Sequence, residues 1–273
     1  MDNKPAEEPS LIQSRQNPKV KFLVGLRKKR NRDQHGCFLI EGRKELESFL
    51  ATQWQLDELF YCPEFIKAED ETLLTKAIEG GVKIFELSAH AFEKCSIREN
   101  SDGWLGLAKN WQTSLSEIRL SEIPLLLILE GTEKPGNLGA ILRTANACGV
   151  DAVICNDPLV DLFNPNVIRA SRGMVFHMQV VIAESKETSE FLKQHNIQAT
   201  ATVCEDGKPI WSQNLSGPLA LVMGNEAIGL SEFWKEKAAL NIVIPTPGPA
   251  DSLNLSTATA ICLYEVLRQR RVP

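Results

Sequence analysis

Three stretches of the chain bring glycines together with amide and hydroxyl side chains. They are EGTEKPGNLGAILRTA (130–145), VMGNEAIGLSE (222–232) and IPTPGPADSLNLSTATA (244–260). Glycine lets a ligand approach the main chain closely, while amides and hydroxyls donate and accept hydrogen bonds. In the third stretch Asp251 is the one titratable side chain. The stretches therefore predict a pocket that positions its ligand, rather than one built around a strong acid, base or nucleophile.

Motifs of several common enzyme classes are missing from the sequence. G-x-G-x-x-G does not occur, and GNEAIGLS departs from a Walker A loop because Leu230 stands where lysine must reach the phosphates. G-x-S-x-G is missing too, and the four histidines have no acid and nucleophile at a recognisable spacing. The seven cysteines include no C-x-x-C pair. We therefore expect no dinucleotide or nucleoside triphosphate site, no hydrolase chemistry and no bound metal.

The three stretches follow short apolar runs that indicate β-strands. From residue 125 onward such runs alternate with segments of helical periodicity. The expected strands are 125–130, 151–157, 178–184, 198–203, 219–224 and 241–245, and the expected helices are 138–148, 165–173, 187–196 and 256–270. This alternation predicts an α/β fold with a parallel sheet covered on both faces. Ligands of such sheets bind beyond the carboxyl ends of the strands, where the three stretches would meet.

The first part of the chain has a separate and shorter α/β pattern. Between residues 37 and 110, strand-like and helix-like runs alternate over a length typical of a small domain. The segment 111–124 is polar, has weak periodicity and ends in proline, which indicates a linker. We therefore predict a small α/β domain at 1–110, a linker at 111–124 and a larger domain at 125–273.

A run of positive charge precedes the small α/β pattern. The chain has a net charge of −5, yet eight lysines and arginines and no acid lie between residues 15 and 32. Because apolar residues are interleaved, the run predicts one short amphipathic helix whose cationic face suits a phosphate backbone. A solvated helix face without a partner is the alternative. The candidate RNA-binding residues are Arg15, Lys19, Lys21, Arg27, Lys28, Lys29 and Arg30.

Composition indicates a soluble globular protein, with 43% apolar and 24% charged residues. No apolar run approaches the length needed to span a bilayer. The polar start MDNKPAEEPS is unlike a signal or transit peptide. We expect a cytoplasmic protein without a membrane partner.

The three stretches together resemble the motifs of a known family, the SpoU/TrmH class of SPOUT methyltransferases. The matching residues are Gly136-Asn137-Leu138-Gly139 with Arg143-Thr144, then Gly224-Asn225-Glu226 with Gly229-Leu230-Ser231, then Ile244-Pro245 with Ser252-Leu253-Asn254-Leu255-Ser256. The resemblance covers about residues 125–270. It implies an enzyme that transfers a methyl group from S-adenosyl-L-methionine to a ribose 2′-hydroxyl of RNA. It also implies that the parallel-sheet domain contains a trefoil knot.

The amino-terminal half resembles family members as well. SRQNPKVKFLVGLRKK followed by FLIEGRKELE is similar to the start of members that carry a small α/β RNA-binding domain. This amino-terminal unit resembles domains that hold structured ribosomal RNA. Ribosomal RNA is therefore the expected substrate, with transfer RNA as the alternative. A non-catalytic RNA-binding or assembly factor and a base-methylating relative are the other open possibilities. By the same analogy we expect a homodimer whose interface includes the last helix.

The resemblance also assigns roles to individual residues. It implies that main-chain groups at Gly224, Ile244 and Leu253 hold S-adenosylmethionine. It places Arg143 in the catalytic set, although a guanidinium hardly deprotonates in proteins and is therefore a poor general base. We expect Arg143 to bind the target phosphate and to stabilise the developing alkoxide.

Asn137, Glu226, Ser252 and Asn254 complete the implied catalytic set, and some have simpler alternatives. Asn137 orients the arginine or the hydroxyl, or it is the N-cap of its helix. Glu226 pairs with the arginine, supports its own loop, or lies in the first turn of a helix. Ser252 and Asn254 are expected to form hydrogen bonds across the pocket, whereas Ser256 is expected to cap the last helix.

Overall fold

A computed structural model describes residues 9–67 and 71–271. The chain forms two compact units. Unit 1 comprises Met1–Trp111 and Phe163–Phe176, and unit 2 comprises Gln112–Leu162 and His177–Pro273. No helix within the described ranges is long and apolar enough to cross a membrane.

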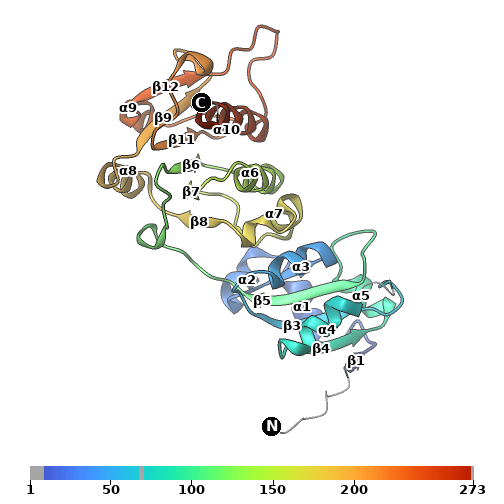
Figure 1. The fold of residues 1–273 in the computed structure, drawn as a ribbon. Coiled ribbons are helices and arrows are strands. Elements are labelled where there is room, and N and C mark those ends of the chain that lie inside the picture. The colour runs from blue at the N-terminus through green and yellow to red at the C-terminus, as the bar shows by residue number, and fades with distance from the viewer. Residues whose placement is uncertain (1–8, 68–70, 272–273) are drawn as a thin grey trace. The chain divides into compact units, whose positions relative to one another are not determined.

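Unit 2 is built on a seven-stranded parallel sheet (Figure 1). Its strands are β6 (Leu125–Glu130), β7 (Ala152–Asn156), β8 (Gln179–Ile182), β9 (Gln198–Val203), β10 (Lys208–Pro209), β11 (Leu219–Met223) and β12 (Leu240–Val243). Their spatial order is β10-β12-β9-β11-β6-β7-β8, and every neighbouring pair is parallel. The parallel sheet predicted from the sequence is confirmed, and the short edge strand β10 lies outside the predicted set.

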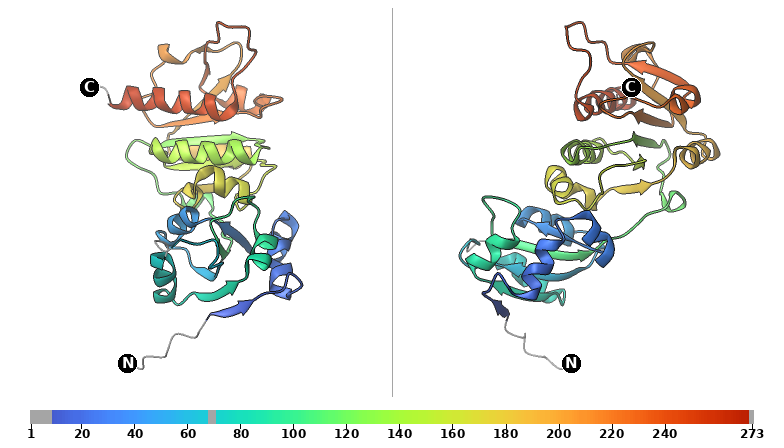
Figure 2. Two further views of the ribbon diagram at one scale, coloured as in Figure 1. Left: turned by 90° about the vertical axis from the view of Figure 1, so that its right-hand side faces the viewer. Right: turned by 180° about the vertical axis from the view of Figure 1, so that it is seen from behind.

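Helices cover both faces of this sheet. On one face α6 (Pro135–Ala147) and α10 (Leu255–Arg271) lie side by side, and on the other lie α8 (Ser185–Gln194) and α9 (Glu232–Lys237) (Figures 1 and 2). Phe191 of α8 and Trp234 of α9 share one apolar cluster with alternate side chains of the central strands. Every residue from Leu125 to Leu129 is at most 2% exposed. That continuous burial is expected of a strand covered from both sides.

Unit 1 has a mixed five-stranded sheet. Its strands are β1 (Ser10–Ile12), β2 (Cys37–Glu41), β3 (Leu56–Tyr61), β4 (Lys83–Leu87) and β5 (Trp104–Lys109), in the order β1-β4-β3-β5-β2. β1, β4 and β3 are parallel, whereas β5 runs antiparallel to β3 and to β2. The accompanying helices are α1 (Pro18–Gly25), α2 (Lys29–His35), α3 (Arg43–Leu50), α4 (Glu71–Glu79) and α5 (Ala89–Cys95).

A short segment from between β7 and β8 belongs to unit 1. It contains α7 (Pro165–Ser171) and a 3-10 turn, Met174–Phe176. The Phe163 ring stacks on the Phe38 ring of β2 with centroids 4.5 Å apart, and the Phe176 ring meets the Phe49 ring edge-on at 5.0 Å. Aromatic packing of this kind explains why the segment groups with unit 1. The predicted domain bounds, 1–110 and 125–273, assign this segment to the second domain, whereas the structure groups it with unit 1.

The segment predicted as a linker packs on unit 2 over most of its length. Leu115, Ile118 and Leu120 are partly buried against the α8–α9 cluster. The Ser121 main-chain N–H and hydroxyl donate to the Asp151 carboxylate at 2.9 and 3.1 Å. Ordinary apolar and polar contacts therefore hold most of 112–124 in place.

The basic run forms two helices instead of the single one that the sequence predicts. Asn17 caps α1 by accepting from the Lys19 N–H, and Pro18 occupies the first position. α1 ends at Gly25, and α2 begins at Lys29. Side chains of α2 satisfy the freed carbonyls, since Asn31 donates to Gly25 and the buried Arg32 donates to Leu26.

Several cations of this run are used inside unit 1. Arg15 pairs with Glu93, Lys19 with Glu58 and Lys29 with Asp33, and the Arg27 guanidinium donates to the carbonyls of Lys94, Cys95 and Ser96. Arg27 thus satisfies the carboxyl end of α5. By contrast, the side chains of Lys21, Lys28 and Arg30 are exposed and make no ion pair or hydrogen bond with any described residue. The charge run therefore contains both structural and free cations.

This division predicts opposite outcomes for two neighbouring substitutions. Arg27→Gln should lower the free energy of unfolding by about 1 kcal/mol, because a partly exposed charged group loses its bonds to the α5 carbonyls. Lys21→Gln should leave it within about 0.5 kcal/mol of the wild type. Urea unfolding followed by circular dichroism measures both. Equal effects of the two substitutions would contradict the structural role of Arg27.

Candidate functional site

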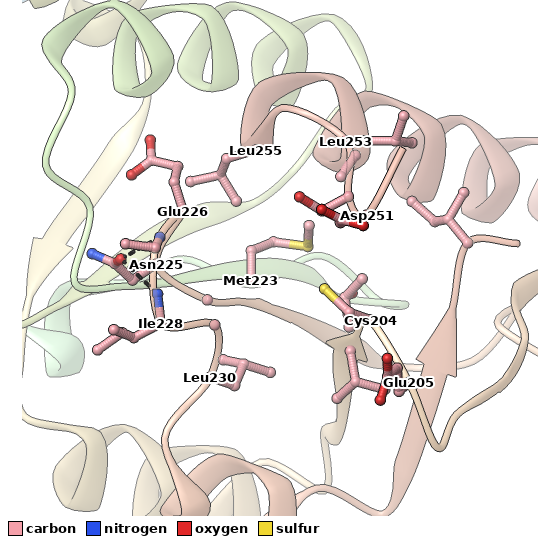
Figure 3. A pocket seen from close by; sticks show the side chains of 18 of the residues that line it. Cys204, Glu205, Met223, Asn225, Glu226, Ile228, Leu230, Asp251, Leu253 and Leu255 are labelled. Carbon is pink, nitrogen blue, oxygen red and sulfur yellow. Dashed lines mark hydrogen bonds between the residues drawn. The ribbon is translucent and has the colours of Figure 1, made fainter. Parts of the chain in front are cut away.

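A cavity of about 630 Å³ opens at the carboxyl ends of β9, β11 and β12 (Figure 3). Its wall comes from residues 202–206 and 223–230, from Lys235, and from single residues of two further segments, namely Asn241, Ile244, Thr246, Asp251, Ser252, Leu253, Leu255 and Ala258. A volume of this size is typical of pockets that hold small organic ligands. The second and third stretches identified in the sequence therefore meet at one cavity, and the first, 130–145, lies outside its lining.

A tight turn after β11 forms one side of the cavity. Asn225 and Gly229 exchange main-chain hydrogen bonds of 3.0 Å in both directions. The Asn225 side-chain oxygen accepts from the N–H groups of Ala227 and Ile228, at 2.7 and 3.3 Å (Figure 3). Gly229 has a φ of +70°, which favours glycine. Residues 225–229 are therefore a fixed turn.

Gly224, just before this turn, cannot carry a larger side chain. A Cβ atom added there would overlap the main chain of Gly229 and Leu230. Those atoms belong to the main chain of the turn, so they cannot move aside as the end of a flexible side chain could. The wall of the cavity at Gly224 is consequently bare main chain, which a ligand can approach closely.

The turn is tied to the loop that follows β6. The Asn225 amide nitrogen donates to the Gly131 carbonyl at 2.6 Å and to the Glu133 carboxylate at 3.0 Å. The Ser231 N–H and hydroxyl donate to the Glu130 carboxylate at 2.8 and 2.6 Å. The Asn225–Gly131 and Ser231–Glu130 bonds join residues that are 94 and 101 residues apart in sequence. Asn225 and Ser231 belong to the second sequence motif, from which no role for either residue was predicted.

Three of the predicted catalytic residues lie together in one polar network. The Asn137 amide nitrogen of α6 donates to the Glu226 carboxylate, and the Asn254 amide nitrogen donates to the Asn137 oxygen at 3.2 Å. The Asn254 oxygen accepts from the Ser256 N–H and hydroxyl at 3.0 and 2.7 Å. The network of Glu226, Asn137 and Asn254 therefore joins the turn, α6 and the start of α10.

The network corrects three simpler expectations. Asn137 is not an N-cap, because Pro135 starts α6 two residues earlier and Asn137 lies inside the helix. Asn254, not Ser256, caps α10, since the helix begins at Leu255 and the Asn254 oxygen accepts from its second N–H. Glu226 lies in the 225–229 turn and not in the first turn of a helix.

Arg143 is exposed on α6, away from the cavity lining. Leu138, Ile141 and Leu142 of the same helix are buried, as the helical period predicts for the opposite face. The Arg143 side chain makes no ion pair or hydrogen bond with any described residue, so it does not pair with Glu226. Its guanidinium is available to an anion outside the chain.

The three residues expected to hold a cofactor, Gly224, Ile244 and Leu253, all line the cavity. Ser252 lines it as well, and its side chain makes no hydrogen bond with a described residue. Residues 202–206, which form the end of β9 and the start of the loop after it, also line the cavity and were not predicted as site residues. The sequence predicted that a strand ends there, but it does not show that this strand lies beside β11 and so reaches the cavity.

The chemistry of the wall suits a ligand with apolar and polar parts. Met223, Leu230 and Leu253 supply apolar surface. The Asn241 side-chain oxygen, also on the wall, is buried and has no partner in the described structure. Such an unpaired group is costly unless a ligand or water satisfies it. Within the described ranges, no three His, Cys, Asp or Glu side chains form a group that could hold a metal ion.

One cysteine lies on the wall of the cavity. Cys204 is exposed, and the other six cysteines are buried. Burial raises the pKa of the Cys155 and Cys262 thiols to about 12. Because the thiolate is the reactive form, those buried thiols are inert at neutral pH.

Comparison with known proteins places this geometry in a family. Residues 124–264 match the SpoU rRNA Methylase family, and residues 17–106 match the MRM3-like substrate binding domain. A relative from Bacillus subtilis (strain 168), the 23S rRNA (guanosine(2553)-2′-O)-methyltransferase RlmP, is 31% identical over 93% of this chain and 98% of its own length.

Two crystal structures have the same fold over nearly the whole chain. An RNA 2′-O ribose methyltransferase is 37% identical with a TM-score of 0.85, covering 96% of this chain and 100% of that one. An AdoMet-bound rRNA methyltransferase from Sinorhizobium meliloti is 29% identical with a TM-score of 0.87, covering 95% and 97%. The resemblance inferred from the three motifs is confirmed. The chain belongs to the SpoU rRNA methylase family.

Proposed function

We propose that this protein is an S-adenosylmethionine-dependent methyltransferase that modifies a ribose 2′-hydroxyl of ribosomal RNA. The observation that carries the proposal is the cavity walled by bare main chain at Gly224, which the Asn137–Glu226 hydrogen bond links to α6, the helix that carries the exposed and unpaired Arg143. The relative named as a 23S rRNA 2′-O-methyltransferase and the AdoMet-bound neighbour support the substrate and the cofactor. Transfer RNA is the alternative substrate.

The residues of the cavity fit the cofactor. The bound cofactor supplies a methyl group that its sulfonium already makes electrophilic. The chain therefore has to position the reactants and stabilise charge, which is a task for fixed loops. The main chain at Gly224, Ile244 and Leu253 lines the cavity and would hold the cofactor.

Arg143 would act on the RNA. Its guanidinium binds the phosphate of the target nucleotide in two-pronged geometry and stabilises the alkoxide that develops on the 2′-oxygen. The proton leaves to phosphate or water, since guanidinium does not accept one at neutral pH. The network of Glu226, Asn137 and Asn254 holds the start of α6 and thus the helix that carries Arg143. Those three side chains are positioning residues, and Ser252 remains free to contact substrate.

Cations of unit 1 would bind the RNA backbone. Lys21, Lys28 and Arg30 are the first choice, because they are exposed and unpaired among the described residues. The proposed RNA-binding set also includes four cations that should contribute less to RNA affinity, because each already has a partner inside unit 1: Arg15, Lys19, Arg27 and Lys29. Each phosphate contact adds to the salt dependence of binding.

The proposal includes a homodimer, a trefoil knot in unit 2 and a cytoplasmic location. The exposed Ile261 and Tyr264 on α10, 39% and 57% exposed, support an interface on that helix. Sedimentation velocity on the protein and on a Tyr264→Glu variant tests the dimer. A wild-type protein that sediments as a monomer would rule it out.

Mapping of the modified atom tests the function. Ribosomal and transfer RNA from cells with and without the gene are cleaved with alkali, because a 2′-O-methyl group blocks cleavage at one phosphodiester. The expected result is one protected position in ribosomal RNA that disappears with the gene. A protected position in transfer RNA instead would show that transfer RNA, not ribosomal RNA, is the substrate. A base methylation, or no change in either RNA, would refute the proposal.

Arg143→Lys keeps the positive charge but loses the planar fork that holds a phosphate. We expect a single-turnover methylation rate lower by about 100-fold, as for loss of one group that stabilises an oxyanion. Affinity for S-adenosylmethionine should not change, because Arg143 lies outside the cavity lining. Arg271→Lys, at the exposed end of α10, is the matched control. A wild-type rate for Arg143→Lys would remove the arginine from the mechanism.

Thiol labelling tests the position of the cofactor without an activity assay. At about pH 8 a thiol reagent should modify Cys204 and leave the six buried cysteines of the native protein intact. Because Cys204 lines the cavity, S-adenosylmethionine should slow its labelling. A Cys204→Ser variant gives the background. Labelling of Cys204 at the same rate with saturating cofactor would place the cofactor elsewhere.

A further inference from the structure

Two apolar side chains of unit 2 are unusually open to water. Ile228 is 85% exposed and Leu159 is 70% exposed, the highest values among the large apolar residues that the structure describes. Scattered exposed apolar residues are ordinary on protein surfaces. These two differ because both lie at the carboxyl edge of the sheet, where Leu159 follows β7 and Ile228 follows β11.

Ile228 and Leu159 are attached to the same loop. The Leu159 N–H donates to the Thr132 carbonyl at 3.0 Å. Asn225, at the start of the turn that carries Ile228, donates to the carbonyl of the preceding residue, Gly131, at 2.6 Å. Since β6 lies between β11 and β7 in the sheet, the two apolar residues flank the loop after β6.

The turn presents Ile228 in a fixed orientation. Its own N–H is bound by the Asn225 side chain, and the Asn225–Gly229 pair closes the turn. Ile228 lies at the rim of the cavity, and its side chain points away from Met223 (Figure 3). A rigid apolar group binds a partner with little loss of conformational entropy.

We propose that Ile228 and Leu159 form an apolar clamp for the base of the target nucleotide. The inference rests on the proposed function. In a nucleotide the base is bonded to C1′, and the reacting hydroxyl is on the adjacent C2′. A hydroxyl held at the cavity mouth therefore brings its base beside the rim, where Ile228 lies. Proteins commonly hold such splayed RNA bases by packing aromatic or guanidinium groups against their faces, and an aliphatic side chain can make apolar contact with the same faces.

The clamp provides affinity for an unstacked base without selecting its identity. Contact with the face of a base tolerates any of the four, because each presents a similar flat surface. Selection of the nucleotide then depends on hydrogen bonds to base edges or on the fold of the RNA. In this arrangement both clamp residues affect RNA binding, and Leu159, which lies outside the cavity lining, leaves binding of the methyl donor unchanged.

Methylation kinetics of Ile228→Ser and Leu159→Ser test the clamp, with unmodified 23S ribosomal RNA transcribed in vitro as the probe. Each variant should raise KM for the RNA about tenfold, the size expected when a buried Ile or Leu side chain loses its apolar contact. With RNA and S-adenosylmethionine both saturating, the kcat of Leu159→Ser, whose side chain lies outside the cavity lining, should stay near the wild-type value. Because both side chains are exposed, the urea midpoint should not change in either variant. Leu159 lies outside the cavity lining, so calorimetry on Leu159→Ser should give an unaltered affinity for S-adenosylmethionine.

Ile123→Ser is the matched control, since Ile123 is 51% exposed and lies just before β6, at the opposite edge of the sheet. Its KM should equal that of the wild type. Wild-type KM values in both clamp variants would overturn the clamp and leave the proposed function intact. A wild-type protein that methylates no ribosomal RNA would overturn the proposed function and the clamp with it.

Discussion

The absence of space at Gly224 is the constraint on which the site depends. The main chain of Gly229 and Leu230 lies so close that no side chain fits, which leaves bare main chain facing the cavity. Asn225 holds this arrangement, because its side chain closes the turn with one end and reaches the β6 loop with the other. The Asn225 amide, in a residue that is 8% exposed, thus fixes both the turn that walls the cavity and the loop after β6.

The remainder of the site follows from that fixed turn. Glu226 is held in the turn and accepts from Asn137, which in turn accepts from Asn254 at the start of α10. The chain of bonds links the cavity wall to the two helices on one face of the sheet. Arg143 on α6 is therefore carried by a framework of hydrogen bonds, while its own guanidinium stays unpaired among the described residues. Methyl transfer from a sulfonium suits such a site, because alignment and charge stabilisation are its main requirements.

The sequence predicts the larger sheet and the cavity well, for physical reasons that can be named. Apolar runs such as LLLILE are too short for helices and too continuous for half-exposed strands, so they indicate a buried parallel sheet. The motif residues Gly224, Ile244 and Leu253 line one cavity because parallel strands end at the same edge. The start of α6 was misplaced by three residues because Pro135, a favoured first helical residue, was assigned to the loop.

Long-range contacts could not be predicted from composition and spacing. The internal partners of Arg15, Lys19 and Arg27 lie about 40 to 80 residues away, with separations of 78, 39 and 67 residues, so a basic run alone does not distinguish structural from free cations. The packing of Phe163 and Phe176 with unit 1 is equally invisible in the periodicity of α7. Asn225 belongs to the second sequence motif, yet its contacts with Gly131 and Glu133 depend on β11 lying beside β6.

In this structure the bare main chain at Gly224 is the part of the wall that would hold the methyl donor. Calorimetric titration of S-adenosylmethionine into the wild type, Gly224→Ala and Gly217→Ala measures this role, and Gly217→Ala is the control because a Cβ at Gly217 meets no atom within 4 Å. Gly224→Ala should lose at least about tenfold in affinity, while Gly217→Ala should bind like the wild type and all three proteins should unfold cooperatively. Wild-type affinity in a folded Gly224→Ala protein would contradict this role.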